Sequence, residues 1–151
     1  MEKRRINVRA IVWRDGKILA VKHRKEDGSE SSYWAVPGGG LDPLEDLRSG
    51  VRRELIEETG VEATVGDLLF MQQFHSEREG TDEELEFFFH IEDTPEFDAV
   101  DLEKTSHGFH ELARIEFVDP TQVTILPERL STLDIAGLIE RGSTVEISNR
   151  L

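Results

Sequence analysis

The chain has 151 residues, the usual size of one domain, and we expect residues 1–151 to form a single domain. Its 32 acidic and 18 basic residues give a formal net charge of −14, which disfavours nucleic acid as a partner because an acidic surface repels a phosphate backbone. The absence of cysteine excludes disulfides and thiolate metal sites, and no apolar run is long enough for a signal peptide or a membrane span, so we expect a cytoplasmic protein without a membrane partner.

The first third of the chain predicts a hairpin followed by a glycine-rich segment. Alternating apolar residues indicate a strand over 6–13, and residues 17–23 indicate a second strand. Asp15 and Gly16 between them suit the positive φ angles of a tight turn. Residues 33–40, YWAVPGGG, then predict a short strand that runs into a glycine-rich turn.

A helix is predicted over residues 46–59. Asp46 is its expected N-cap, and Gly60 is expected to end it in the left-handed conformation. An earlier start at Asp42, where the sequence also resembles a capping box, is the alternative.

The rest of the chain mixes strands with one more helix, which predicts a mixed sheet covered by helices. Leu85, Phe87 and Phe89 alternate along one strand and are expected in the core. Residues 92–110 form a long polar connection of the kind that is often functional or mobile. The predicted elements are strands over 67–75, 84–91 and 113–118 and a second helix over 126–142.

Three glutamates crowd the first predicted helix. The apolar stripe of this helix consists of Leu47, Val51 and Leu55. On a wheel of about 100° per residue, Glu58 projects inside the stripe, Glu54 borders it, and Glu57 continues the same arc. A carboxylate on the buried side is costly unless it is paired or binds a metal ion. Because the helix has no histidine or cysteine, Mg²⁺ or Mn²⁺ is the expected ion.

Two other residues of this helix each allow two interpretations. Gly50 removes a side chain beside the glutamates, which makes room either for a ligand or for a closely packed strand. Arg53 precedes Glu57 by four residues and could orient it, or it could pair with Glu45 and tie the preceding loop to the helix.

The spacing of these residues resembles a known family motif. Gly39, five residues, Glu45, seven residues and then RELIEETGV over residues 53–61 match the Nudix box at every defined position, and the preceding WAVPGGG is also similar to that family. The resemblance implies an α/β fold, a Nudix-type α/β/α sandwich with a mixed β-sheet between helices. It also implies hydrolysis of a diphosphate bond in a nucleoside diphosphate linked to another group.

The same resemblance implies roles for the residues of the box. Glu57 and Glu58 would coordinate divalent ions, and Glu54 would share in coordination or position a water molecule. The carbonyl of Gly39 would be a further ligand, and Arg53 would hold the carboxylates in place. Glu54, Glu57 and Arg53 are therefore the expected catalytic residues of the box.

Outside the box, Glu111 stands just before a strand, where many members of the family carry another catalytic acid, and Glu79 and Glu103 are its rivals. Gly39 and Gly40 are expected to contact the substrate. Trp34 is the first candidate for an aromatic wall of the site, although a place in the core is favoured over that role. Other candidates for a base, a phosphate contact or a stacking side chain are Tyr33, Phe74, His75, Phe88, His90, His107 and His110.

Three functions compete with hydrolysis of a small nucleotide. A catalytically silent nucleotide-binding module is the main alternative, although such modules usually lose glutamates that this chain keeps. An isoprenoid diphosphate isomerase would need a cysteine, and an RNA-decapping enzyme would need a basic surface. We therefore expect a nucleoside triphosphate or an ADP-ribose-type compound as the substrate. A homodimer is a further expectation from the resemblance.

Overall fold

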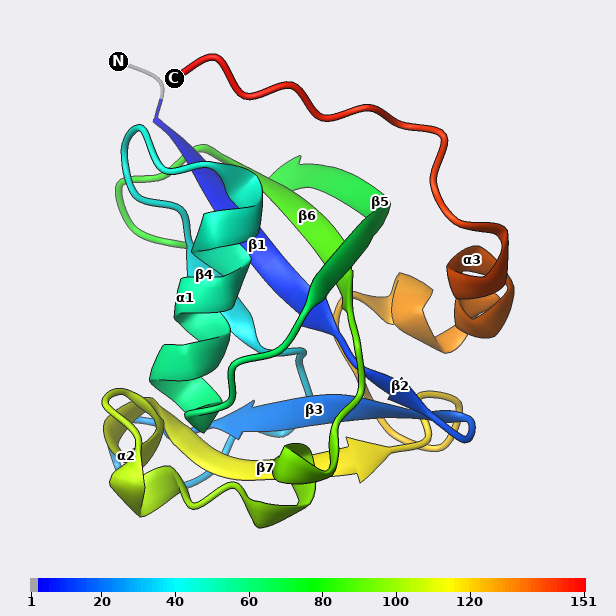
Figure 1. The fold of residues 1–151 in the computed structure, drawn as a ribbon. Helices are drawn as coiled ribbons and strands as arrows, with labels where there is room; N and C mark the ends of the chain where they lie inside the picture. Colours follow the sequence, from blue (N-terminus) through cyan, green and yellow to red (C-terminus); the bar gives the residue numbers. More distant parts are fainter. Residues whose placement is uncertain (1–2) are drawn as a thin grey trace.

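The computed structural model describes residues 3–151 as two sheets, and the chain passes from one to the other at Val12 (Figure 1). The first sheet has the order β4-β1-β6-β5 and is mixed, because β1 pairs parallel with β6 and antiparallel with β4. The second sheet has the order β2-β3-β7 and is antiparallel. The strands are β1 (Arg4–Ile11), β2 (Trp13–Arg14), β3 (Lys17–His23), β4 (Gly38–Gly40), β5 (Val65–His75), β6 (Glu83–Ile91) and β7 (Leu112–Val118).

Helices cover both faces of the four-stranded sheet. Along β1, Val8 and Ala10 pack in the core that includes Val51 and Leu55 of α1, whereas Ile11 packs in a second core that includes Ile135 of α3. The alternation follows from the two-residue period of a strand. The arrangement confirms the expected α/β/α layering around a mixed sheet. The helices are α1 (Leu47–Thr59), α2 (Gly108–Glu111) and α3 (Ile135–Arg141), with 3-10 turns η1 (Pro95–Ala99), η2 (Leu102–Lys104) and η3 (Glu128–Ser131).

The predicted tight turn is present, but the hairpin that it closes is shorter than expected. Asp15 and Gly16 have φ angles of 48° and 80°, as a type I′ turn requires. The strand predicted over 6–13 is divided at Val12, so β1 pairs in the four-stranded sheet and only β2 pairs with β3. The division occurs because the chain passes from one sheet to the other at this point.

Helix α1 has the predicted limits. The Asp46 side chain accepts a hydrogen bond from the Ser49 N–H, and Gly60, at φ 74°, ends the helix. The alternative start at Asp42 is wrong, because Leu44 has a φ of 63° and so cannot be helical.

The helix predicted over 126–142 is wrong in extent, because the segment contains η3 and then the separate helix α3. Asp134 caps α3 by accepting a hydrogen bond from the Gly137 N–H, which starts a new helix in the middle of the predicted one. Leu130 and Ile135 from the two pieces are both buried. Within residues 3–151, no helix combines the length and the apolar character that crossing a bilayer requires.

Candidate active site

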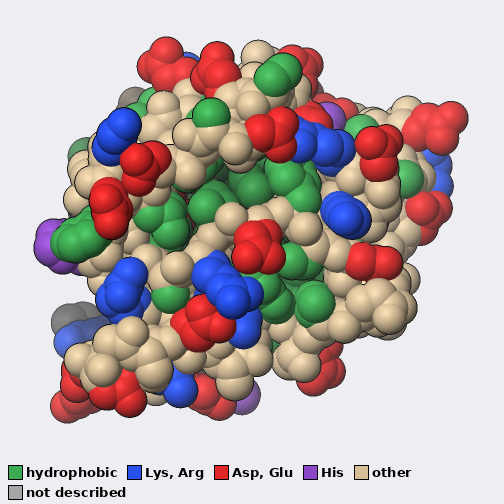
Figure 2. All heavy atoms as spheres, turned by 90° about the horizontal axis from the view of Figure 1, so that it is seen from below, with side chains coloured by type: hydrophobic (Ala, Val, Ile, Leu, Met, Phe, Trp, Pro, Cys, Tyr) green, Lys and Arg blue, Asp and Glu red, His purple; other side chains and the backbone are tan. Residues whose placement is uncertain are grey.

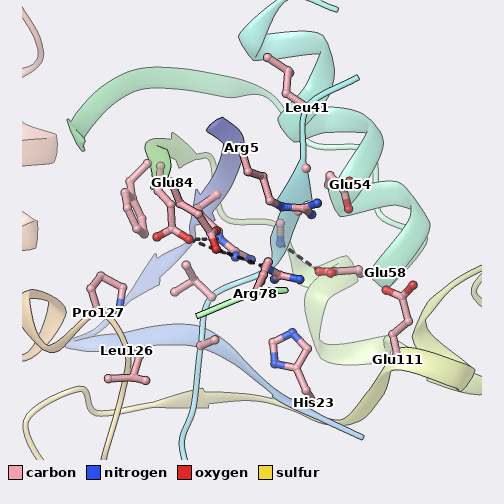
Figure 3. A pocket seen from close by; sticks show the side chains of 18 of the residues that line it. Arg5, His23, Leu41, Glu54, Glu58, Arg78, Glu84, Glu111, Leu126 and Pro127 are labelled. Carbon is pink, nitrogen blue, oxygen red and sulfur yellow. Dashed lines mark hydrogen bonds and ion pairs between the residues drawn. The ribbon is translucent and has the colours of Figure 1, made fainter. Parts of the chain in front are cut away.

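A cleft of about 1250 Å³ opens between α1, the glycine-rich strand β4, the first sheet and α2. Its volume exceeds the range of about 300–1000 Å³ that is usual for small-ligand pockets. Figure 3 shows Glu54, Glu58 and Glu111 on one side of this cleft and Glu84 with Pro127 on the other. Arg5 and Arg78 lie between the two sides.

Glu54 lies directly against the glycine-rich strand. A Cβ atom placed on Gly39 would come within 2.7 Å of the Glu54 carboxylate, so a larger residue there would displace this flexible side chain. Burial raises the pKa of Glu54, and the neighbouring Arg53 opposes that rise. The helix and strand β4 thus form a cradle that places a half-buried carboxylate beside backbone.

Glu58 is the most deeply buried acid of α1, with 2% of its surface exposed. Its Oε2 accepts a hydrogen bond of 3.1 Å from the Gly38 N–H. Burial raises the pKa of Glu58 to about 8, against the attraction of Arg9. The placement agrees with the wheel, which puts this residue inside the apolar stripe of the helix.

Arg53 satisfies both interpretations made from the sequence. Its guanidinium donates two hydrogen bonds of 2.8 Å to Glu45 and one of 3.0 Å to the Gly40 carbonyl, which ties the loop to the helix. It also donates to Glu54 at 3.0 Å and to Glu57 at 3.3 Å. One cation therefore orients three carboxylates.

Glu57 has a second partner that the sequence did not indicate. Nδ1 of His107 lies 3.0 Å from Oε2 of Glu57, and the His107 backbone N–H donates to the Glu57 carbonyl. The long connection before β7 is thereby attached to the end of α1. His107 was one of several candidate histidines, and only the path of this connection distinguishes it from the rest.

The donor set of this region suits a hard cation. Glu54, Glu57 and Glu58 offer carboxylate oxygens, and the cradle at Gly39 leaves its backbone exposed to them. Over residues 3–151, no three acidic or histidine side chains converge on one point at ligand distance. Instead, the carboxylates of the helix are held by Arg53, His107 and the Gly38 N–H. The residues fit a divalent ion in chemistry, with side-chain rotation needed to bring their oxygens together.

Glu111, at the end of α2, lines the cleft and lies close enough to Glu58 to raise its pKa by charge repulsion. Glu79 is exposed on the β5–β6 hairpin, and Glu103 lies in η2, where it lines a separate shallow pocket. Of the three acids considered from the sequence, Glu111 is thus the one at the cleft. Its catalytic role remains a prediction.

Trp34 is not a wall of the cleft, so its selection as a site residue is wrong and the place in the core that the sequence favoured is the one it takes. Its side chain is 7% exposed and packs in the second core, because residue 34 forms a bridge with Ile125 and turns inward. Its neighbour Tyr33 lines the cleft instead, together with Phe74 and Phe88. Gly39 and Gly40 also line it, as expected of substrate-contacting residues.

Gly50 serves packing rather than a ligand. A Cβ atom at this position would lie 2.4 Å from Leu41 and 3.4 Å from Val8, both of which press against the helix. Of the two interpretations of this glycine, close packing against a strand is the one that the structure supports.

The floor of the cleft contains charged residues that the sequence reasoning missed. Glu84 and Glu86 on β6 are 4% and 6% exposed, whereas Leu85 and Phe87, predicted as core, are only half-buried. Among the predicted trio only Phe89 is fully buried. The sequence did contain one indication that this face of β6 is buried, because Phe88, a large apolar residue, lies on the same face as the two glutamates. Arg5 and Arg9, from β1, also line this floor.

Known proteins share the sequence and the fold of this chain. The family model described as NUDIX domain matches residues 3–141. The CTP pyrophosphohydrolase of Escherichia coli strain K12 is 42% identical over 66 residues, which cover 44% of this chain and 48% of that protein. This chain therefore spans about half the length of that relative. The nucleoside triphosphatase NudI of Escherichia fergusonii is 26% identical over 151 residues, covering 91% of this chain and 99% of that protein.

Solved structures agree over almost the full chain. The solution structure of the E. coli ORF135 protein has a TM-score of 0.65 at 24% identity and covers 96% of both chains. The crystal structure of a MutT NUDIX hydrolase from Burkholderia pseudomallei has a TM-score of 0.67 at 22% identity, covering 86% of this chain and 96% of that one. These likenesses concern the fold, and they confirm the predicted α/β class.

Proposed function

The chain belongs to the Nudix family, whose hydrolases act on pyrophosphate bonds, and we propose that it cleaves a diphosphate bond in a small nucleotide with the help of Mg²⁺ or Mn²⁺. One observation carries the proposal: acids that suit a cation and arginines that suit a phosphate line the same cleft. The acids are Glu54, Glu57, Glu58 and Glu111, and the arginines are Arg5, Arg9 and Arg78.

The metal would be held by Glu54, Glu57 and Glu58 and by the carbonyl of Gly39. Bound there, it would neutralise the negative charge of the diphosphate and acidify water in the cleft. Arg53 would keep the carboxylates aligned, since it already bonds Glu54 and Glu57 at 3.0 and 3.3 Å. Its further bonds to Glu45 fix the guanidinium itself, so the alignment does not depend on the ligand.

Two acids are candidates for taking a proton from the attacking water. Glu54 is half-buried and has a raised pKa, which makes its ionised form a better base than an exposed carboxylate. Glu111 lies on the same side of the cleft as Glu58, at the end of the short helix α2, and the connection that precedes α2 is hydrogen-bonded to α1. Arg5 and Arg9 would orient the phosphates by charge and by hydrogen bonds.

A small soluble nucleotide fits the surface better than a polymer does. The chain carries a net charge of −14, and on the face shown in Figure 2 acidic and basic side chains alternate around a hollow with hydrophobic side chains on its floor. Lysine and arginine form no continuous track on that face for a phosphate backbone. Two relatives are named for cleaving nucleoside triphosphates, which favours such a triphosphate as the substrate here.

A panel of purified compounds tests this function. Nucleoside triphosphates, ADP-ribose, nucleotide sugars, diadenosine polyphosphates and capped RNA would be incubated with the protein and Mg²⁺, and the products separated by chromatography. We expect cleavage within the phosphate chain of a small nucleotide, with a nucleoside monophosphate as one product. Preference for capped RNA, or binding without turnover of any compound, would contradict the proposal and favour decapping or a silent binding module.

A further inference from the structure

Two buried glutamates form the end of the cleft opposite α1. Glu84 and Glu86 stand two residues apart on β6, so both point to the same face, and both line the cleft. They are only 4% and 6% exposed. Burying a carboxylate is costly unless it is paired and hydrogen-bonded, so such a pair at the end of a ligand cleft needs an explanation.

Glu84 is held in one orientation by three neighbours on two segments, β1 and the β5–β6 hairpin loop. Its Oε2 accepts a hydrogen bond of 2.6 Å from Asn7, and its Oε1 accepts one of 2.7 Å from Ser76. Arg78 on the β5–β6 hairpin lies 3.3 Å from Oε1. The amide of Asn7 is itself oriented, because its oxygen accepts a hydrogen bond of 2.8 Å from Arg5.

These partners keep Glu84 ionised. Burial alone would raise the pKa of Glu84, but the hydrogen bonds from Ser76 and Asn7 and the charge of Arg78 outweigh burial and hold the pKa below its usual range. An ionised carboxylate only accepts hydrogen bonds. Its two oxygens have about four lone-pair positions, of which Asn7 and Ser76 each occupy one while Arg78 lies beside Oε1, so the carboxylate can still accept from a ligand donor.

Glu86, two residues further along β6, is also held by hydrogen bonds to both of its carboxylate oxygens. Its Oε1 accepts from Arg9 at 3.2 Å, and its Oε2 accepts from Gln72 at 2.9 Å. The floor therefore presents carboxylate acceptors with guanidinium and amide donors directly beside them. The aromatic ring of Phe74, which is 37% exposed, also lines the cleft and offers apolar surface to a planar group.

We propose that Glu84 selects a nucleobase with an amino group where the oxo counterpart has a carbonyl, so that cytosine is preferred over uracil and adenine over hypoxanthine. The inference rests on the proposed function. With the diphosphate beside the acids of α1, the nucleoside extends toward the opposite end of the cleft, where Glu84 lies. A carboxylate that accepts from the amino group of cytosine is a known mode of base recognition. The ring nitrogen next to that amino group would accept a hydrogen bond from Arg78, which lies beside Glu84.

An oxo base fits this end of the cleft poorly. Where cytosine has an amino group, uracil has a carbonyl oxygen, and that oxygen would face an ionised carboxylate without a proton between them. If uracil turned to offer its N3–H, a carbonyl oxygen on each side would approach the same carboxylate. A site that buries an acceptor and receives no donor loses binding energy, which is the physical basis of discrimination.

The wild-type protein provides the first test, with substrate pairs that differ only in amino and oxo groups. Values of kcat/KM would be measured for CTP against UTP and for ATP against ITP. We expect the amino member of each pair to be favoured by about tenfold or more. Ratios near one, with normal turnover, would overturn the inference and leave the proposed function intact. Absence of turnover with all four compounds would instead contradict the proposed function on which the inference rests.

Two variants of one strand provide the second test. Glu84→Gln supplies an amide that can donate as well as accept, so the CTP/UTP ratio should fall about tenfold, mainly through KM. Glu83→Gln is the matched control, because Glu83 is the next residue on β6, faces away from the cleft and bonds Gln73 at 2.6 Å. Its ratio should equal that of the wild type. An unchanged ratio in a folded Glu84→Gln protein would overturn the role of Glu84, and if that variant fails to fold, the wild-type ratios decide.

Discussion

The backbone N–H of Gly38 donates a hydrogen bond of 3.1 Å to Oε2 of Glu58. Gly38 has a φ of 146°, and a Cβ atom there would lie 2.1 Å from the Val8 carbonyl oxygen, so β4 can pair this closely with β1 only with glycine. The glycine-rich strand and the acidic helix are thus joined at the most buried acid of the site.

The contribution of Glu58 to the stability of the metal-free protein should fall as the pH rises. Burial raises the pKa of Glu58 from 4.5 to about 8 in the folded state, so folding favours the protonated form. The stabilising effect of that proton is complete below pH 4.5 and is lost as the pH rises through 8. Its size is on the order of a few kcal/mol. Urea unfolding in a chelator at several pH values would measure it.

The variant Glu58→Gln should remove this part of the pH dependence, because the amide does not ionise. The exposed Glu62, just after the helix, provides the control, and Glu62→Gln should behave as the wild type. Parallel curves for Glu58→Gln and the wild type would show that Glu58 does not titrate in this range.

Millimolar Mg²⁺ should raise the melting temperature more than Na⁺ does at equal ionic strength. A ligand of the native state stabilises it by mass action, whereas screening of surface charge is common to both salts. Thermal scans of the wild type would measure the two shifts. In Glu57→Gln, the amount by which the Mg²⁺ shift in melting temperature exceeds the Na⁺ shift should become smaller. Identical shifts for both salts in the wild type would leave screening as the whole effect.

Glu57→Gln should lower kcat by about a hundredfold or more, the scale for losing a group that stabilises charge in the transition state. The fold should persist, because Arg53 keeps its bonds to Glu45 and Glu54. Steady-state kinetics at saturating Mg²⁺, with a thermal scan of the same sample, would measure both effects. Near-normal turnover would show that catalysis does not depend on Glu57 and that its assignment as a metal ligand is wrong.

Glu111→Gln should lose more activity than Glu79→Gln or Glu103→Gln. Glu111 lines the main cleft, whereas the other two acids lie on the hairpin and in η2. Initial rates with one substrate would rank the three variants, each compared by a thermal scan to confirm folding. If all three lose little activity, the base belongs to α1, with Glu54 as the remaining candidate.

The acids of α1 could be predicted because they lie on one helix, where the period of 3.6 residues determines which way each side chain points. Glu84 could not, because its burial depends on the pairing of β6 with β1 and on Asn7, which is 77 residues away. Trp34 was misjudged for a similar reason. Proximity in sequence to Gly39 suggested the site, but the bridge to Ile125 turns the indole into the core.

The parallel pairing of β1 with β6 affects how the molecule folds. It joins residues 79 positions apart, such as Arg4 and Glu83, and the loop that it closes contains α1 and the glycine-rich strand. Closing a long loop costs entropy before its contacts form, so topologies of this kind fold slowly. Helix α1 can form early from local hydrogen bonds, but Glu58 meets Gly38 only after β4 has paired with β1. During synthesis, β1 can pair with β6 only after the ribosome has released the residues of β6, which ends at Ile91.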